Sequence, residues 1–304
     1  MPLLTSLGMA FFLCAWLWLH PWGLLGRDDP AGLERKHQAR PIPTVGLLVP
    51  TLGLLLVGGL PLGSALCLAL MALLGWIDDR QGSRWPWTLK LATQIAALAL
   101  FLIWLGPYAT EVRAESSVFG HALLLLGVSW LILTAWNLYD NFDGALAWTA
   151  LASLGSLLWI GTGPVIPPLL PALAGGLVGF VLFNWPGARL YLGDAGSQVT
   201  GFALLLLGFA LASTTSSNGE PMLLHSGSSS RLLPWLLLPH LVPLLDLCQV
   251  VLGRLLRGKA PWIGDRRHLA HLVHGCGCPA ALVAPLLALV QFGAAALGRL
   301  AFAS

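Results

Sequence analysis

Long apolar stretches joined by short polar connections are the feature that most constrains this chain. Of its 304 residues, 57% are hydrophobic and only 10% carry a charged side chain, a composition that excludes an ordinary soluble domain. A helix needs about 17 to 25 predominantly apolar residues to cross a bilayer. The sequence therefore predicts an all-α integral membrane protein that forms one multi-pass domain over residues 1–304.

Ten segments have the required length and composition. They are residues 3–25, 44–60, 62–78, 89–106, 121–138, 144–162, 165–183, 197–213, 231–253 and 279–302. The second and third share one apolar run, which we divide at Gly58-Gly59-Leu60-Pro61 because proline disfavours continuation of a helix. No basic residue precedes the first segment, unlike a secretory signal peptide, so we expect it to remain as a helix.

The distribution of basic residues gives an independent test of this helix count. If the loops that follow odd-numbered segments lie on one side, that side carries 13 of the 16 Lys and Arg residues. Arg113, Arg231 and Arg299 fall on the other side. The positive-inside rule then predicts that the basic side is cytoplasmic and that both termini lie outside.

Aspartates gather where several segments begin or end on the predicted cytoplasmic side. Asp78 and Asp79 end segment 62–78, Asp140 and Asp143 follow segment 121–138, and Asp194 precedes segment 197–213. Ionisable groups at membrane depth are costly, and gathered acids repel one another unless a cation lies among them. We expect this cation to be a divalent metal that holds a phosphorylated substrate.

Polar residues near the first and last of these acids fit phosphate chemistry. Lys90 and Gln94 lie one helical turn apart, so Lys90 is either a lysine that reaches the lipid headgroups or a phosphate clamp. Asp194 lies in a tight turn between glycines, which suits an approach of the carboxylate and backbone amides to a metal-bound phosphate. We expect Ser197, rather than Asp194, to cap the helix that follows.

The stretch that closes segment 121–138 has acids at regular spacing. Asn137, Asp140 and Asp143 are three residues apart, so a continued helical turn would direct them to one surface. Gly144 permits a turn or a close approach to a ligand. As an alternative, Asp143 could cap the next helix, which would explain one residue of the three.

The loop before the last segment contains a histidine pair. His268 and His271 are on one helical face if this loop is helical, and they could contact a phosphate or a sugar. Asp246 lies in the middle of an apolar segment, where an acid indicates a function or a specific polar partner. Cys276 and Cys278 follow the histidines but lack the two-residue spacer of common zinc sites, so we do not expect zinc.

Taken in order, these motifs resemble the polyprenyl-phosphate N-acetylhexosamine-1-phosphate transferases, the membrane family called glycosyltransferase 4. The matching pieces are Asp29-Pro30 with Arg35-Lys36-His37 and Pro41-Ile42-Pro43, Asp78-Asp79, Lys90 with Gln94, Asn137 to Gly144, Leu192 to Ser197, and Asp246 with Arg254 and Asp265 to His271. They cover nearly the whole chain, and six pieces in register are specific.

The last loop looks more like the undecaprenyl-phosphate GlcNAc-1-phosphate transferase branch, which starts surface polysaccharides. The run of three histidines typical of the peptidoglycan-precursor branch is absent. Leu47, Asn141 and Ala270 depart from the usual family residues, which leaves the donor sugar open.

The resemblance implies transfer of a sugar-1-phosphate from a UDP-sugar to a polyprenyl phosphate in the bacterial inner membrane, with release of UMP. N-acetylglucosamine is the first expectation for the sugar, and Mg²⁺, with Mn²⁺ as a substitute, for the cofactor. The protein partners could include a second copy in a homodimer, and no nucleic acid is expected. Whether a carboxylate or the lipid phosphate attacks first stays open.

The resemblance also implies roles for individual residues. The expected catalytic residues are Asp78, Asp79, Asp143 and His268. The expected substrate-binding residues are Lys36, Lys90, Asn137, Asp140, Arg267 and His271. The expected metal ligands are Asp194 and Asp79, with Asp78 assigned to the lipid phosphate and Asp79 to the metal and nucleotide side.

Three other functions are compatible with parts of the sequence. The peptidoglycan-precursor phospho-MurNAc-pentapeptide transferases are a branch of the same family. The CDP-alcohol phosphotransferases share the spacing of Asp140, Asp143, Gly144 and Ala147, but Trp148 stands where an arginine is required. A transporter or channel could use buried Asp246 in an ion path, although transporters place polar groups near the membrane midplane rather than at one surface.

Overall fold

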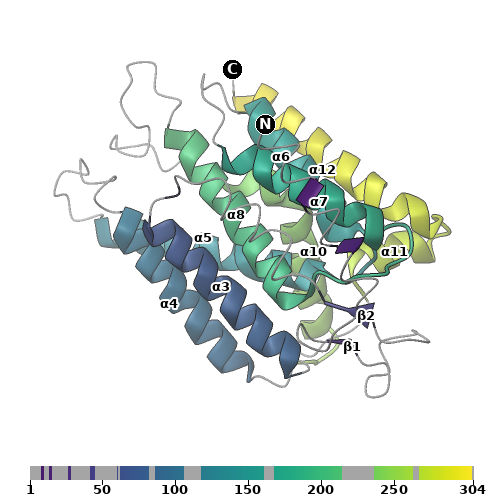
Figure 1. Ribbon diagram of the computed structural model, residues 1–304, viewed down its shortest axis with the longest axis horizontal. Coiled ribbons are helices and arrows are strands. Elements are labelled where there is room, and N and C mark those ends of the chain that lie inside the picture. Colours follow the sequence, from purple (N-terminus) through teal and green to yellow (C-terminus); the bar gives the residue numbers. More distant parts are fainter. Residues whose placement is uncertain are drawn as a thin grey trace.

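The computed structural model is a bundle of apolar helices (Figure 1). It describes residues 8–9, 14–15, 27–28, 42–44, 60, 62–81, 86–105, 118–160, 168–213, 236–262 and 267–302. The long helices are α3 (Leu62–Arg80), α4 (Trp87–Leu105), α5 (Val118–Tyr139), α6 (Ala145–Ile160), α7 (Leu169–Asn184), α8 (Gly193–Ser213), α10 (Leu241–Leu255) and α12 (Ala280–Phe302). The 3₁₀ turn η4 (Leu238–His240) leads into α10, and the short helix α11 (Leu269–Gly275) precedes α12.

Eight of the ten predicted segments coincide with helices in the described part of the chain. Segments 3–25 and 44–60 lie almost wholly outside the described residues, so the count of ten stays a prediction. In the described part of the chain, five helices are long and apolar enough to cross a membrane, and the apolar helical stretches Trp87–Ile103, Ala145–Ile160 and Leu169–Asn184 are shorter. The all-helical prediction is confirmed except for one antiparallel pair of two-residue strands, β1 (Arg27–Asp28) and β2 (Ile42–Pro43).

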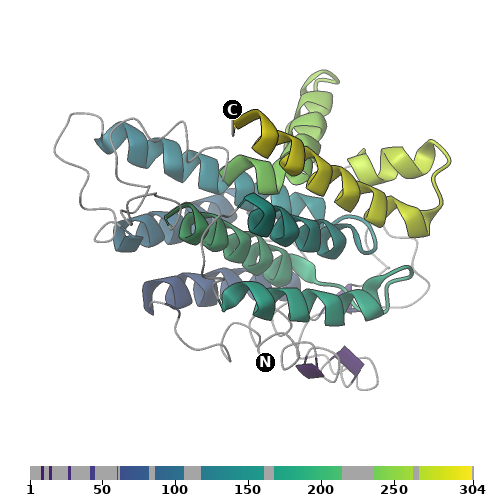
Figure 2. The same ribbon diagram turned by 90° about the horizontal axis from the view of Figure 1, so that it is seen from above.

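Helix α8 forms the centre of the bundle. It contacts α3, α5, α6 and α7, and the views in Figures 1 and 2 both show it between other helices. In α8, 89% of the 18-residue apolar stretch is buried inside the protein, against 33% to 44% of the same length in the other four long apolar helices. Because its surroundings are protein rather than lipid, α8 can carry polar side chains at its start.

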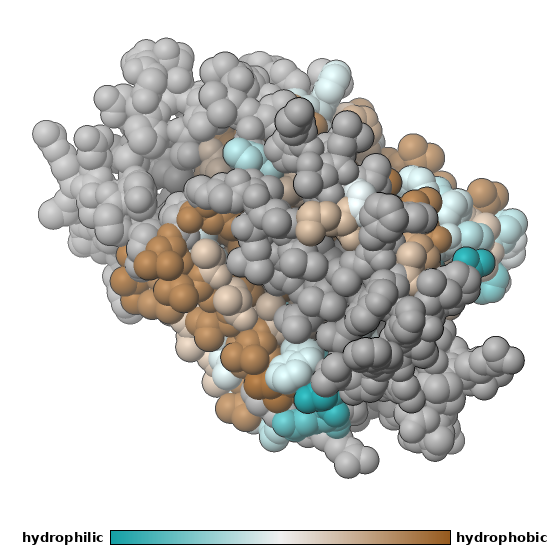
Figure 3. All heavy atoms as spheres, viewed as in Figure 1, coloured by the Kyte–Doolittle hydropathy of each residue, from teal (hydrophilic) through white to brown (hydrophobic). Residues whose placement is uncertain are grey.

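The outer faces of the helices are apolar. On α3, a row of leucines at helical spacing is exposed, with 66% of Leu62 and 48% of Leu73 accessible. Figure 3 shows brown, hydrophobic side chains along the flank formed by α3 and α4, with hydrophilic groups at its lower end. An exposed apolar surface of this kind fits contact with lipid tails rather than with water.

Two glycines let helices approach α8 closely. A Cβ on Gly75 of α3 would lie 2.3 Å from the Cα atom of Ala195, and a Cβ on Gly201 would lie 2.9 Å from the Cβ atom of Trp136 on α5. Real Cβ atoms do not make contacts this short with backbone, so the α3–α8 crossing depends on glycine. The crossing brings the acidic end of α3 to the start of α8.

Candidate active site

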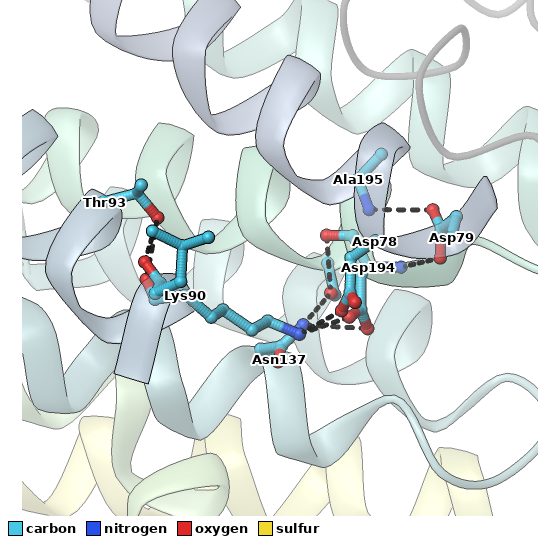
Figure 4. Close-up of polar contacts among 9 residues, drawn as sticks. Asp78, Asp79, Lys90, Thr93, Asn137, Asp194 and Ala195 are labelled. Atoms are coloured by element: carbon cyan, nitrogen blue, oxygen red, sulfur yellow. Dashed lines mark hydrogen bonds and ion pairs between the residues drawn. The ribbon is translucent and has the colours of Figure 1, made fainter. Parts of the chain in front are cut away.

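Four helices bring charged and polar side chains to one point, which we call the Lys90 cluster: Asp78, Lys90, Asn137, Asp194 and Ser197. The Lys90 ammonium donates to Asp78 Oδ2 at 2.7 Å and to Asp194 Oδ2. Asn137 Nδ2 donates to Asp194 Oδ1 at 3.1 Å and to Ser197 Oγ at 3.0 Å. Figure 4 shows the Lys90 side chain extending from α4 toward both carboxylates.

The cluster balances its charges incompletely. Two carboxylates share one ammonium, and Asp78 is buried with 2% of its surface exposed. One of its oxygens, Oδ1, is buried without a hydrogen-bond partner. Like charges this close are tolerated only with a cation between them. In the structure, Lys90 lies between the two carboxylates as a cation. The divalent metal predicted among these acids, and the predicted role of Lys90 as a phosphate clamp, stay predictions.

Asp79 caps the start of α8 from the neighbouring helix. Its two carboxylate oxygens accept the N–H groups of Asp194 at 2.8 Å and of Ala195 at 3.1 Å. Gly193 has φ of +69°, and a Cβ there would lie 2.7 Å from Asp79 Oδ2. The amides that we expected to meet a phosphate thus donate to Asp79, which is also favoured by the positive end of the α8 dipole.

The expectation that Ser197 caps this helix is wrong. Ser197 lies inside α8, where its hydroxyl accepts from Asn137 and donates to the Asp194 carbonyl at 3.2 Å. A neighbouring aspartate has taken the capping role because α8 starts four residues earlier than predicted, at Gly193.

The turn between α5 and α6 carries the other two acids. Helix α5 ends at Tyr139, so Asp140 and Asp143 are not on a continued helical turn as expected. Asp143 Oδ2 accepts the Ala188 N–H at 3.0 Å instead of capping α6. The N–H of Gly144, which has φ of +78°, donates to Asn184 Oδ1 at 2.7 Å.

Asn184 also links this turn to the segment before α8 by a second hydrogen bond. Its Nδ2 donates to the Leu190 carbonyl at 2.8 Å. Burial raises the pKa of the Asp143 carboxyl, although the Ala188 N–H opposes the shift. Burial likewise raises the pKa of Tyr191, with help from the charges of Asp143 and Asp140. The acids at 140 and 143 therefore lie near the loop that leads to Asp194.

A second polar group joins α10 to α11. Asp246, fully buried on α10, has Oδ2 at 2.7 Å from His268 Nδ1, and its Oδ1 accepts the Leu269 N–H at 2.6 Å. His271, one turn further along, packs edge-on against Phe142 with ring centroids 5.5 Å apart. Since Phe142 lies between Asp140 and Asp143, α11 lies beside the acidic turn.

The substrate-binding roles predicted for Arg267 and Lys36 stay predictions. Arg267 is exposed next to His268. Lys36 lies outside the described residues, as do Asp265 and Arg266.

The oxygen donors of the Lys90 cluster fit a small divalent cation. In the described ranges, no group of three or more His, Cys, Asp or Glu side chains is arranged to hold a metal. Magnesium, however, commonly uses one or two carboxylates and takes its other ligands from water and phosphate. Asp194 and the unpaired Oδ1 of Asp78 supply such oxygens. Asp79 already accepts two amide hydrogens, so its predicted role as a ligand stays a prediction.

Comparison with known proteins agrees with this geometry. The model of glycosyl transferase family 4 matches residues 61–212, half of the chain, and this stretch holds the whole Lys90 cluster. The chain belongs to glycosyl transferase family 4. The prediction from the motifs is thereby confirmed, and the chain is a membrane transferase.

The similar members of family 4 include two named activities. The undecaprenyl-phosphate alpha-N-acetylglucosaminyl 1-phosphate transferase of Escherichia coli K12 is 26% identical over 296 residues, covering 91% of this chain and 77% of that protein. The Salmonella typhimurium protein of that name is 26% identical over 276 residues, covering 83% and 70%. The phospho-N-acetylmuramoyl-pentapeptide-transferase of Synechococcus elongatus is 32% identical over 235 residues, covering 66% and 64%.

Sequence reasoning missed two supporting roles in this family 4 site. Asn184 ties the acidic turn to the loop before α8, but nothing in its local sequence signals this. Asp79 acts as a cap for a helix more than a hundred residues away. A glycine directly before Asp194 was the available signal, since its lack of a Cβ leaves room for the Asp79 carboxylate.

Proposed function

We propose that this chain transfers an N-acetylhexosamine-1-phosphate from a UDP-sugar to undecaprenyl phosphate, or a related polyprenyl phosphate, and releases UMP. N-acetylglucosamine is the first choice of sugar. A bond forms between an oxygen of the lipid phosphate and the β-phosphorus of the donor. The bond from that phosphorus to the oxygen shared with the α-phosphorus breaks, and this oxygen leaves with UMP.

The observation that carries the proposal is the convergence of Asp78, Lys90, Asn137 and Asp194 from four helices. An anionic lipid phosphate must approach an anionic diphosphate, so neutralisation and positioning of charge are the main catalytic needs. A fixed ammonium between two carboxylates provides both an anion contact and cation ligands. The names of the Escherichia coli and Salmonella relatives describe this same class of transfer.

The proposed role of each residue follows from its position in the site. Lys90 holds a phosphate once the carboxylates are engaged elsewhere, and Asp78 orients the lipid phosphate. Asp79 holds the start of α8 and so fixes the direction of Asp194. Asp140, Asp143, His268 and His271 lie on the neighbouring turn and helix and contact the donor, together with Lys36 and Arg267.

Magnesium, or manganese in its place, is the proposed cofactor. Asp194 is its main ligand, and the acidic pair Asp78-Asp79 supplies the second carboxylate. The bound ion would neutralise the phosphate oxygens while charge shifts toward the leaving UMP.

The proposed location of this reaction is the cytoplasmic face of the bacterial inner membrane. The 13 basic residues on one side support this orientation. Nucleotide donors are dissolved in the cytoplasm, whereas the polyprenyl tail is embedded in lipid. A site at the ends of apolar helices can reach both.

Release of UMP by the purified protein in lipid nanodiscs tests the proposal. We expect release from UDP-N-acetylglucosamine only when a polyprenyl phosphate is present. UDP-N-acetylgalactosamine and UDP-MurNAc-pentapeptide serve as competing donors in the same assay, and the pentapeptide donor tests the activity named for the Synechococcus relative. CDP-linked alcohols serve as a further control. Absence of UMP release with every UDP-sugar would overturn the proposal.

A further inference from the structure

Asp246 is a charged residue in the middle of an apolar helix, and it makes two separate contacts with the next helix. It is fully buried, so removal of its charge from water is costly unless partners compensate. Oδ1 accepts the Leu269 N–H at 2.6 Å, and Oδ2 lies 2.7 Å from His268 Nδ1. These contacts join α10 to the start of α11 across 22 residues of sequence.

Capping of α11 does not by itself explain an aspartate at this position. A neutral oxygen acceptor at the helix start serves as well as a carboxylate, and Ser, Thr or Asn commonly provides it from the capping position itself. Here His268 occupies that position and makes no side-chain cap. The second carboxylate oxygen is instead directed at the imidazole. An ionised carboxylate can only accept, so its natural partner is a His268 ring with the proton on Nδ1.

The helix that follows His268 lies beside the acidic turn of the candidate site. His271 on the same short helix packs against Phe142, between Asp140 and Asp143 of the acidic turn. Phe142 also contacts His274, so α11 packs along the acidic turn, and His268 precedes this helix by one residue. With Nδ1 bound to Asp246, Nε2 is the ring nitrogen left to meet a substrate.

We infer that Asp246 is a positioning residue for the transfer, and that it holds His268 in the tautomer with the proton on Nδ1. Nε2 then accepts or holds a proton at the substrate phosphate. The assignment of the substrate rests on the proposed function, whereas the tautomer does not.

The substitution Asp246→Asn separates the two contacts. The asparagine oxygen can still accept the Leu269 N–H, so the helix start keeps its cap. Its NH₂ group then faces Nδ1 and can only donate, which requires the unprotonated Nδ1 and moves the proton to Nε2. We expect kcat to fall by about 100-fold or more, as for loss of general acid–base catalysis, while KM for the UDP-sugar changes by less than about threefold, because the ring stays in place.

Nuclear magnetic resonance of ¹⁵N-histidine-labelled protein reads the tautomer directly and needs no activity. The His268 signal is assigned by its loss in His268→Gln, at alkaline pH where imidazole is neutral. We expect protonated Nδ1 in the native protein and protonated Nε2 in Asp246→Asn. Protonated Nε2 in the native protein, or an unchanged tautomer in Asp246→Asn, would overturn the inference.

A double-mutant cycle and a matched control complete the experiment. Asp246→Asn should cost little further activity when His268 is already Gln, because residues that act as a unit are not additive. Gln291→Leu removes another buried polar side chain that supports the same region, through Val242 and the Leu238 carbonyl. We expect it to lower thermal stability and to leave the tautomer unchanged. A tautomer change in this control would assign the effect to general loosening of the fold.

The two proposals fail in different ways. If no UDP-sugar gives UMP but the tautomer switches as expected, the proposed function is wrong and the Asp246–His268 pair stands. If UMP is released and Asp246→Asn keeps native kcat, the positioning role is wrong and the transfer stands.

Discussion

Lys90 is the residue on which the charges of the candidate site depend. Its ammonium separates Asp78 from Asp194 and donates to both. We expect Lys90→Met to reduce UMP release by about 100-fold or more, because two unneutralised carboxylates no longer hold reacting groups in place. Thr93→Ala is the control. This hydroxyl, one turn further along α4, bonds the carbonyls of Leu89 and Lys90 at 2.9 Å and should be replaceable with little loss. Comparable activities of the two variants would contradict the role of Lys90.

Asp143 links stability to pH. Because burial raises its pKa in the folded state, the ionised form is less favourable there than in the unfolded chain. The neutral Asp143 carboxyl therefore contributes to the stability of the folded state below the ordinary aspartate pKa of about 4. This contribution is lost as the pH rises through the raised pKa of the folded state. Asp143→Asn stays neutral and keeps an oxygen for the Ala188 N–H.

Thermal unfolding of the metal-free protein across this range checks the sign of the effect. We expect Asp143→Asn to match the native protein near pH 4 and to become progressively more stable than it toward neutral pH. A stability difference that is constant with pH, or one that favours the native protein at neutral pH, would contradict the pKa shift.

For individual residues, the sequence predicted which side chains belong to the site better than it predicted which groups they contact. The cost of acids in apolar surroundings predicted that the five aspartates at 78, 79, 140, 143 and 194 would share one membrane surface. The structure brings Asp78 and Asp194 together at Lys90, where Asn137 also contacts Asp194. The sequence could not indicate that Asp79 would cap α8, or that Asp246 would bind His268. Such contacts are set by how helices distant in the sequence cross, and local spacing carries no information about that.

Among the helices, the crossing of α3 and α8 matters most for the site. Gly75 leaves no room for a Cβ against the Ala195 backbone. We expect Gly75→Ala to lower the free energy of unfolding by about 1–3 kcal/mol, as overpacked core positions do. UMP release should fall as well, because separation of the helices draws Asp79 away from the α8 amides.

Gly127→Ala on α5 is the matched control, since no atom lies within 4 Å of a Cβ at that position. There, alanine should be neutral or stabilising by up to about 1 kcal/mol, through its higher helix propensity. Equal unfolding temperatures for the two variants would contradict the close crossing.

Helix positions were predictable because bilayer thickness imposes a length that can be counted along the sequence. The helices at 62–80, 118–139 and 280–302 follow the apolar segments closely. The helix ends were less predictable. Helix α8 extends back to Gly193, where Asp79 caps its start, and α5 ends at Tyr139, before the turn in which Gly144 donates to Asn184. Helix α11 is too short for hydrophobic periodicity to indicate it.

For the molecule as a whole, the orientation in the membrane is a prediction from charge alone. The loop after α10 contains Lys259 on the predicted cytoplasmic side, and α12 separates it from the C-terminus at Ser304. Reporter fusions at Lys259 and at Ser304 should therefore report opposite sides, with Lys259 in the cytoplasm. A cytoplasmic signal from both fusions would contradict the predicted topology.

The most direct test of the account is lipid-dependent UMP release by the native protein and by Asp194→Asn, in nanodiscs with saturating magnesium. We predict release by the native protein only when both UDP-N-acetylglucosamine and undecaprenyl phosphate are present. We predict at least about a 100-fold loss in Asp194→Asn, with an unfolding temperature close to native, because asparagine can still accept from Lys90. UMP release that does not need the lipid phosphate, or native turnover in Asp194→Asn, would contradict the claim that the Lys90 cluster carries out sugar-phosphate transfer to a membrane lipid.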